Sequence, residues 1–228
     1  MYQILLLDLD DTILDFHQSE YYAIRKTLRA FGIDPTDDIC DLYSRINLAH
    51  WKALERKEIT RQQLEVSRFE QLFSQLGVSA DAAACGMLYY ENLSAGHYFL
   101  EGAQEAVKKL SGKYRLYMVT NGTSCVQHRR IASSGIAPLF QDIFISQEMG
   151  ADKPDMVFFE NAIARIPDFD ATKAMIVGDS ISSDIRGGKN AGIATCWINP
   201  KGKTAPEHTL PDYQIQSITQ LEALLEKL

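Results

Sequence analysis

The stretch LLLDLDDTILDF, Leu5–Phe16, carries an apolar run directly into a group of carboxylates. Its first residues predict a buried strand, and the acids that follow at the strand's carboxyl end are Asp8, Asp10, Asp11 and Asp15. In an extended segment alternate residues share a face, which places Asp8 and Asp10 together and turns Asp11 away. Two partly desolvated carboxylates this close either bind a cation or share a proton, because their charges repel. The stretch therefore predicts a strand that ends where positive charge is expected.

Five further apolar runs have the length of this opening strand. They cover residues 116–121, 142–146, 174–179, 194–199 and 213–218. Helices are expected between them, including residues 102–112 and 154–166. Short apolar strands separated by helices are typical of parallel sheets covered on both faces, so the pattern predicts an α/β fold with a doubly wound, Rossmann-like parallel sheet. Ligands bind such sheets beyond the carboxyl ends of the strands, where Asp8, Thr120 and Asp179 fall.

Residues 15–96 differ from the rest, because they contain no convincing strand and repeat apolar residues at helical intervals. Four helices are expected here, with ends at Gly32 and Gly77 and a capping box at Thr60–Gln63. The chain is therefore predicted to consist of a Rossmann-like core, residues 1–14 and 97–228, and an inserted all-α cap, residues 15–96. Since the insertion leaves the core directly after the acidic turn, the cap is expected to cover the carboxyl edge of the sheet.

Composition excludes several kinds of partner and site. With 228 residues, a formal net charge of -7 and no run of Lys or Arg, the chain is not expected to bind nucleic-acid polymers or an anionic membrane. Four cysteines, Cys40, Cys85, Cys125 and Cys196, are scattered without a CxxC pair, which argues against a zinc site and a disulfide framework. No basic leader and no membrane-spanning apolar run stands out, so the cytoplasm is the expected location.

The acidic turn suits Mg²⁺ better than Ca²⁺. If Asp8 were the first position of an EF-hand loop, Ile13 would stand in place of the required glycine and Ser19 in place of the glutamate. Mg²⁺ prefers oxygen ligands and usually takes a further carboxylate, together with water and substrate phosphate. The segment GDSISSD supplies Asp179 at another strand end and Asp184 one helical turn later. These carboxylates predict a Mg²⁺ site that draws on two separate strands.

Two further segments complete a set of groups suited to phosphoryl transfer. The segment VTNG ends a strand with the Thr120 hydroxyl, followed by backbone amides that begin at Asn121. Lys153 supplies one fixed cation. Each segment alone is an ordinary turn or an ordinary lysine. Together with the carboxylates they match a reaction in which charge neutralisation and positioning do most of the work.

Four segments in this order resemble the motifs of the haloacid dehalogenase-like hydrolase superfamily, over essentially the whole chain. They are DLDDT at 8–12, VTNG at 119–122, KP at 153–154 and GDSISSD at 178–184. The helical insertion between the first two resembles the C1 cap of subclass I. The resemblance implies that Asp8 is the nucleophile that forms an aspartyl-phosphate and that Asp10 is the general acid and base. It further implies that Thr120, Asn121 and Lys153 bind the phosphate, and that Mg²⁺ is held by Asp8, the Asp10 backbone carbonyl and Asp179, with Asp184 in the outer shell.

The resemblance also separates activities within the superfamily. Haloacid dehalogenases lack an acid at the place of Asp10, because a departing halide needs no proton, so Asp10 favours a phosphatase. Sugar phosphomutases usually carry an acid just before the metal aspartate, where this chain has Gly178. Residues 145–155 and 178–200 are similar to the pyrimidine 5'-nucleotidase branch, which implies a small-molecule phosphomonoester substrate, namely a (deoxy)nucleoside 5'-monophosphate.

Two alternatives remain open at this level. A sugar-phosphate or phosphoglycolate phosphatase has the same core groups, and the cap would select the substrate. Phe16, His17, Tyr21, His50 and Trp51 are candidates to face a base or sugar, although the apolar stripe that contains Tyr21 favours a place in the helical core. The alternative from another class is a phosphate-binding or signalling module, because receiver domains also gather carboxylates, Thr and Lys around Mg²⁺. Asp10 and the helical insertion argue against it.

Overall fold

The computed structural model describes all residues, 1–228, and the chain forms two compact units. The first unit comprises residues 1–16 and 97–228, and the second comprises residues 17–96. The chain passes from the first unit to the second after Phe16, two residues later than the boundary after residue 14 that the sequence predicts. No helix in either unit is long and apolar enough to cross a membrane.

A six-stranded sheet forms the centre of the first unit, and every pair of neighbouring strands is parallel. Its strands are β1 (Ile4–Leu7), β2 (Arg115–Thr120), β3 (Asp142–Ile145), β4 (Ala174–Gly178), β5 (Ala194–Ile198) and β6 (Tyr213–Ile215). All six predicted strands are confirmed. Their order across the sheet is β3-β2-β1-β4-β5-β6, so the chain winds outward from β1 in both directions. The predicted doubly wound α/β fold is confirmed.

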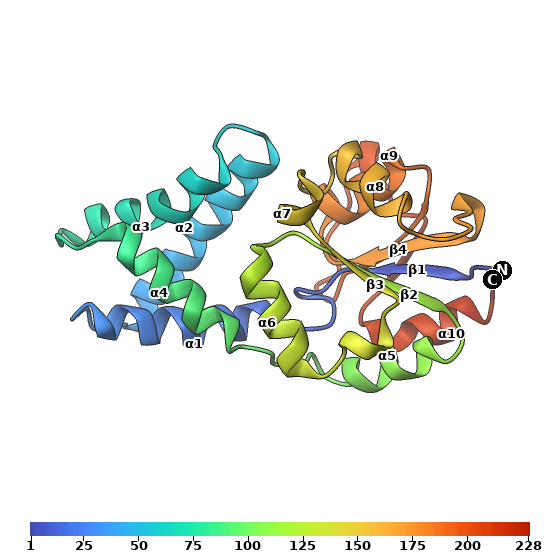
Figure 1. The fold of residues 1–228 in the computed structure, drawn as a ribbon, viewed down its shortest axis with the longest axis horizontal. Coiled ribbons are helices and arrows are strands. Elements are labelled where there is room, and N and C mark those ends of the chain that lie inside the picture. The colour runs from blue at the N-terminus through green and yellow to red at the C-terminus, as the bar shows by residue number, and fades with distance from the viewer. The chain divides into compact units, whose positions relative to one another are not determined.

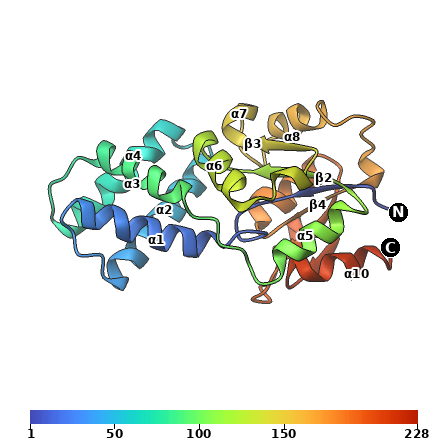
Figure 2. The same cartoon turned by 60° about the horizontal axis from the view of Figure 1, so that its bottom comes forward.

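Two apolar layers cover the sheet, because alternate residues of each strand point to opposite faces. Leu5 and Leu7 pack with one layer, and Ile4 and Leu6 pack with the other. The first layer contains α5 (Ala103–Ser111), α6 (Ser124–Ser134) and α10 (Leu221–Leu225). The second contains α7 (Ser146–Met149) and α8 (Met156–Ile163), and α9 (Arg186–Asn190) lies against it through Gly187 and Gly188, which adjoin Phe159 and Ile176. Figures 1 and 2 show α5 and α10 on the opposite side of the sheet from α8.

The helix predicted from residue 154 begins later than expected. Asp155 is the N-cap of α8, and its carboxylate accepts a hydrogen bond from the backbone N–H of Val157. A capping aspartate satisfies an amide that would otherwise lack a partner, so Pro154 lies before the helix rather than in its first turn.

Four helices form the second unit, as predicted: α1 (Phe16–Ala30), α2 (Asp37–Glu55), α3 (Arg61–Leu76) and α4 (Ala82–Ser94). The capping box at Thr60 is confirmed, since its hydroxyl accepts from Gln63 N–H and the Gln63 side chain accepts from Thr60 N–H. Gly77 ends α3 in the left-handed conformation, with φ of 64°. Tyr43, Phe69 and Tyr89 form an aromatic centre, with ring centroids 5.2 to 5.6 Å apart.

Candidate active site

The candidate site lies at the carboxyl ends of three neighbouring strands. Asp8 directly follows β1, Thr120 is the last residue of β2, and Asp179 directly follows β4. Because β2, β1 and β4 are adjacent and parallel, these ends meet at one edge of the sheet. One carboxylate oxygen each from Asp8, Asp179 and Asp184 lies within 4.8 Å of the others. The fold thus brings together the acids that the sequence analysis took from two distant motifs.

Asp8 is nearly buried and is held from two sides. Lys153 Nζ lies 2.7 Å from Asp8 Oδ1, and the Thr12 hydroxyl donates to Oδ2 at 3.2 Å. Burial raises the pKa of Asp8 to about 7, and Lys153 opposes that rise while Asp184 adds to it. A carboxylate in this setting depends on neighbouring positive charge to stay ionised.

Lys153 lies in the interior, with 1 % of its surface exposed. Its ammonium group uses all three donors within 2.7 Å, on Asp8 Oδ1, Asp184 Oδ1 and the backbone carbonyl of Val119. Burial alone would lower its pKa, but Asp184 and Asp8 together raise the pKa above the usual lysine value. Lys153 is therefore a permanent cation that joins the acidic segments of β1 and β4.

Asp179 and Asp184 complete the acidic group. Burial, together with the negative charges of Asp8 and Asp184, raises the pKa of Asp179 to about 9. The indole N–H of Trp197 on β5 donates to the backbone carbonyl of Asp179 at 2.7 Å, which fixes the turn after β4. Three converging carboxylates against one lysine leave excess negative charge, and oxygen donors of this kind suit a hard divalent cation. The residues present therefore fit a metal ion.

Gly178 provides the space that Asp184 occupies. A Cβ atom at position 178 would lie 2.2 Å from Asp184 Oδ2 and 2.3 Å from its Cγ. Asp184 Oδ2 also accepts the backbone N–H of Ser180 at 3.1 Å. The segment between them forms a π-helical turn, Ile181–Ile185, a rare geometry that is frequent at functional sites.

Asp10 lies in the turn after β1, two residues beyond Asp8, but it contacts a different set of side chains. Its Oδ2 accepts from Gln127 Nε2 at 2.9 Å, and its Oδ1 lies 2.7 Å from Arg130 Nη1. Gln127 Nε2 also donates to the Thr120 hydroxyl at 2.8 Å. Neither Gln127 nor Arg130 is predicted from the sequence, because a glutamine and an arginine on a helix normally face solvent. The only local signal is their three-residue spacing, which puts both on one face of α6.

Asn121 has a role that the sequence did not indicate. Its side-chain amide donates to the Lys153 carbonyl at 2.9 Å, and its side-chain oxygen accepts the Lys153 N–H at 2.8 Å. This pair of bonds ties the end of β2 to the backbone that carries Lys153. Asp11 behaves as a turn residue, since it has φ of 57° and its carboxylate accepts the Phe16 N–H at 3.0 Å.

The aromatic and histidine candidates for substrate contact differ in the partners that the structure gives them. Phe16 lies beneath Arg130, with the guanidinium carbon 5.8 Å from the ring centroid. Tyr21 is 40 % exposed and donates to Asp37, so the expectation that it packs in the helical core is wrong. Its hydroxyl also accepts a hydrogen bond from Arg25, and both partners lie at the surface of the helical unit. His50 contacts the Ile46 carbonyl, and Trp51 stacks with Arg61.

Comparison with known proteins agrees with this geometry. Residues 5–198 match the family described as haloacid dehalogenase-like hydrolase. The chain is 38% identical to the putative HAD-hydrolase YfnB of Bacillus subtilis, over 98% of this chain and 95% of the relative. It is 37% identical to the pyrimidine 5'-nucleotidase PynA of Streptococcus pneumoniae, over 99% of this chain and 96% of the relative. The solved structure of YfnB, which is bound to magnesium, superimposes with a TM-score of 0.94 and covers 98% of both chains.

Proposed function

Because the chain belongs to the haloacid dehalogenase-like hydrolase family, we propose that it is a Mg²⁺-dependent phosphomonoesterase that acts on (deoxy)nucleoside 5'-monophosphates. The observation that carries the proposal is the group of Asp8, Lys153, Asp179 and Asp184 at one edge of the sheet, all buried except the partly exposed Asp179. It offers a carboxylate nucleophile together with the positive charge needed to receive a phosphate.

Asp8 attacks phosphorus in the first half of the proposed reaction, and the bond from phosphorus to the substrate oxygen breaks. The proton that this oxygen needs comes from Asp10, which then takes a proton from the water that hydrolyses the aspartyl-phosphate. Lys153 offsets the negative charge of nucleophile and phosphate, and the Thr120 hydroxyl and the Asn121 backbone N–H hold the phosphoryl oxygens. Mg²⁺ bound by Asp8, Asp179 and the Asp10 carbonyl, with Asp184 in its outer shell, would supply further charge neutralisation.

The presence of Asp10 supports ester hydrolysis over dehalogenation. An alkoxide leaving group needs a proton, whereas a halide does not. The nucleotide substrate is supported by two relatives that are named as pyrimidine 5'-nucleotidases, PynA and, at 28% identity over 98% of this chain, YjjG of Escherichia coli. The sugar-phosphate alternative uses the same core groups and is separated by substrate preference.

The test is a panel of phosphomonoesters with the purified protein and Mg²⁺, comparing pyrimidine and purine monophosphates with sugar phosphates and phosphoglycolate. We expect phosphate release to be fastest from a pyrimidine nucleotide, and Asp8→Asn to lower it at least about a thousandfold. Asp11→Asn is the matched control, since asparagine accepts the Phe16 N–H and tolerates the left-handed conformation, so activity should persist. Preference for a sugar phosphate would refute the nucleotide substrate, and no release from any ester would refute the phosphatase.

A further inference from the structure

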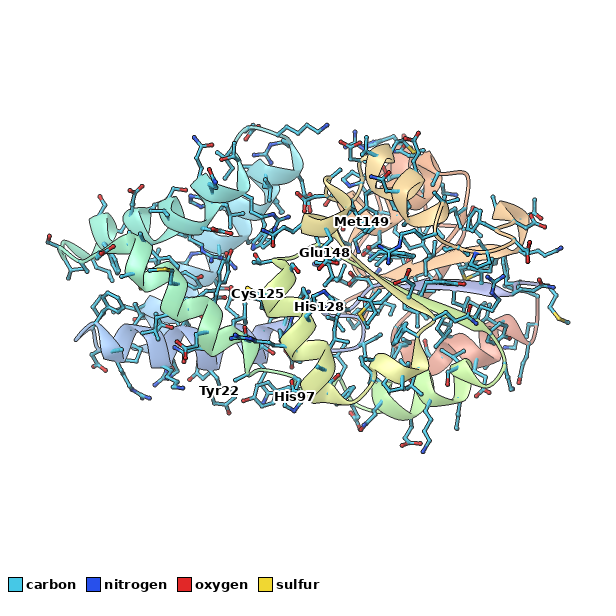
Figure 3. The ribbon with its side chains drawn as sticks, in the orientation of Figure 1. Tyr22, His97, Cys125, His128, Glu148 and Met149 are labelled. Atoms are coloured by element: carbon cyan, nitrogen blue, oxygen red, sulfur yellow. The ribbon has the colours of Figure 1, made fainter.

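Helix α6 has two different faces. Its solvent side carries Cys125 and His128, and His128 Nε2 lies 2.7 Å from Glu148 on α7 (Figure 3). Its other side carries Gln127 and Arg130, which are 2 % and 0 % exposed. A fully buried arginine is rare unless paired, so the position of Arg130 requires a partner.

The partner of Arg130 is Asp10. Arg130 Nη1 lies 2.7 Å from Asp10 Oδ1, and it donates to Gln127 Oε1 at 2.9 Å. These contacts determine the orientation of the Gln127 amide, because its oxygen faces the guanidinium and its nitrogen faces Asp10 Oδ2 and the Thr120 hydroxyl. Rotating the amide by half a turn would bring its oxygen against the Asp10 carboxylate and its nitrogen against Arg130. The arrangement thus has one favourable hydrogen-bonding pattern.

Gly122 provides independent support for this arrangement. A Cβ atom at position 122 would lie 2.6 Å from Gln127 Cγ and 3.0 Å from its Nε2. Gly122 does not have a left-handed φ, so the turn itself does not require glycine here. The glycine of the VTNG segment leaves room for Gln127 to reach Asp10 and Thr120.

From this geometry we propose that Gln127 and Arg130 are positioning residues for proton transfer by Asp10. The inference rests on the proposed phosphomonoesterase function. Arg130 and the amide of Gln127 hold the Asp10 carboxyl group in one orientation, from which its proton passes to the substrate oxygen as the phosphorus–oxygen bond breaks. Gln127 also donates a hydrogen bond to the Thr120 hydroxyl oxygen. The Thr120 hydroxyl proton therefore points away from Gln127 and can be donated to a phosphoryl oxygen.

The test exploits leaving groups that need a proton to different degrees. A nucleoside 5'-monophosphate leaves as an alcohol and requires protonation, whereas p-nitrophenyl phosphate leaves as a stable phenolate. The parameter to compare is kcat/KM, because it reports the steps up to the first irreversible phosphoryl transfer and excludes later hydrolysis of the aspartyl-phosphate. We expect Arg130→Met to lower kcat/KM about a hundredfold for the nucleotide and less than about threefold for p-nitrophenyl phosphate.

Two further variants complete the series. Arg130→Lys keeps a charge near Asp10 and should recover part of the loss. Gly122→Ala, which displaces Gln127 from both Asp10 and Thr120, should lower kcat/KM for both substrates, with the larger loss on the nucleotide. Arg129→Met is the matched control, because this arginine is the exposed neighbour on the same helix. It should leave both substrates unaffected.

The outcomes separate the two proposals. A wild-type protein that hydrolyses neither substrate would overturn the phosphatase and the inference with it. A wild-type protein that hydrolyses both, with variants that lose kcat/KM equally for both substrates, would overturn the positioning role alone. Equal loss is the expected result of a merely structural defect. No loss on the nucleotide in Arg130→Met or Gly122→Ala would also refute it.

Discussion

At the scale of single residues, the absence of a side chain at position 178 is as important as the charges around it. Asp184 fills the space beside Gly178 and makes a 2.7 Å ion pair with Lys153, with both side chains 1% exposed. Removing one member of a buried ion pair leaves an uncompensated charge in the interior, which costs far more than a surface pair contributes. The glycine therefore protects the charge balance of the site.

We expect Gly178→Ala to destabilise the protein by about 3 kcal/mol or more, because the new methyl group displaces the Asp184 carboxylate from Lys153. The measurement is the free energy of unfolding in urea. Gly112→Ala is the matched control, since it adds the same methyl group at a helix end where the nearest atom, the Lys109 carbonyl oxygen, is 3.5 Å away. Its effect should stay within about 1 kcal/mol. Equal losses in both variants would contradict the steric explanation.

At the scale of elements, the start of α3 depends on one hydroxyl. Thr60 caps the helix through a reciprocal pair of bonds with Gln63, and both bonds are at the surface. Because this helix start depends on two bonds between neighbouring residues, a substitution at Thr60 alone can measure how much they stabilise it.

Thr60→Ala removes the hydroxyl that accepts the Gln63 N–H, and we expect it to cost about 1 kcal/mol. Amide hydrogen exchange in the first turn of α3 should accelerate accordingly. Thr60→Ser retains the oxygen and should cost only a few tenths of a kcal/mol. A Ser variant as unstable as the Ala variant would show that the methyl group, and not the hydrogen bond, stabilises this end.

The interior of the helical unit contains a second polar arrangement. Asn47 donates to Glu20 at 2.7 Å and accepts from Arg68 at 2.9 Å, and all three residues are at most 5 % exposed. Burial raises the pKa of Glu20, which its hydrogen bonds to Ser44 and Asn47 oppose. The Arg68 guanidinium also lies 4.8 Å from the Tyr89 ring centroid. Asn47 therefore links two buried charges on α1 and α3.

We expect Asn47→Leu to destabilise the helical unit by about 3 kcal/mol, since it leaves both charged groups without this partner. The chain has two tryptophans, so urea unfolding of a Trp197→Phe protein followed by Trp51 fluorescence reports on this unit. Leu48→Asn makes the reverse exchange at a neighbouring position that is 56 % exposed, and it should change stability by less than about 0.5 kcal/mol. Comparable effects at the two positions would contradict a role for the buried network.

At the scale of the whole molecule, the acidic group links metal binding to pH. Burial raises the pKa of Asp8 to about 7 and that of Asp179 to about 9, from an ordinary value of 3.8. Between the ordinary and the raised values, the folded protein holds more protons than the unfolded chain. The contribution of Asp8 and Asp179 to the free energy of unfolding is therefore largest below about pH 4, and it falls as pH rises to about 9.

We expect Mg²⁺ to stabilise the protein more at alkaline than at acid pH, because a cation that binds these carboxylates must displace their protons. The measurement is the change in Tm between chelator and excess Mg²⁺ across this pH range. Asp179→Asn removes one titrating group and should weaken both the pH dependence and the effect of Mg²⁺. A Mg²⁺ effect that is independent of pH would contradict the linkage.

Much of the fold and part of the candidate site could be predicted from local patterns. The six apolar runs became six parallel strands, and the capping box and Gly77 marked the ends of α3 as expected. Apolar periodicity and turn chemistry act over a few residues, so a single sequence carries them. The same applies to the position of Asp8 and Asp179 at one edge of the sheet, because the carboxyl ends of parallel strands lie on the same edge whatever the strand order. Their close approach depends on β1 and β4 being neighbours.

Packing between distant parts of the chain accounts for the features that the local sequence patterns did not predict. The strand order, the exposed position of Tyr21 and the contacts of Gln127 and Arg130 with Asp10 depend on which elements meet. Asp10 and Gln127 are 117 positions apart, and neither residue alone differs from an ordinary polar side chain. The residue types along the chain thus specified the elements and the acids that end the strands, because those follow from local free energies. The partners of those acids were specified by packing between elements, since a side chain acquires a buried partner only when the fold removes water from both.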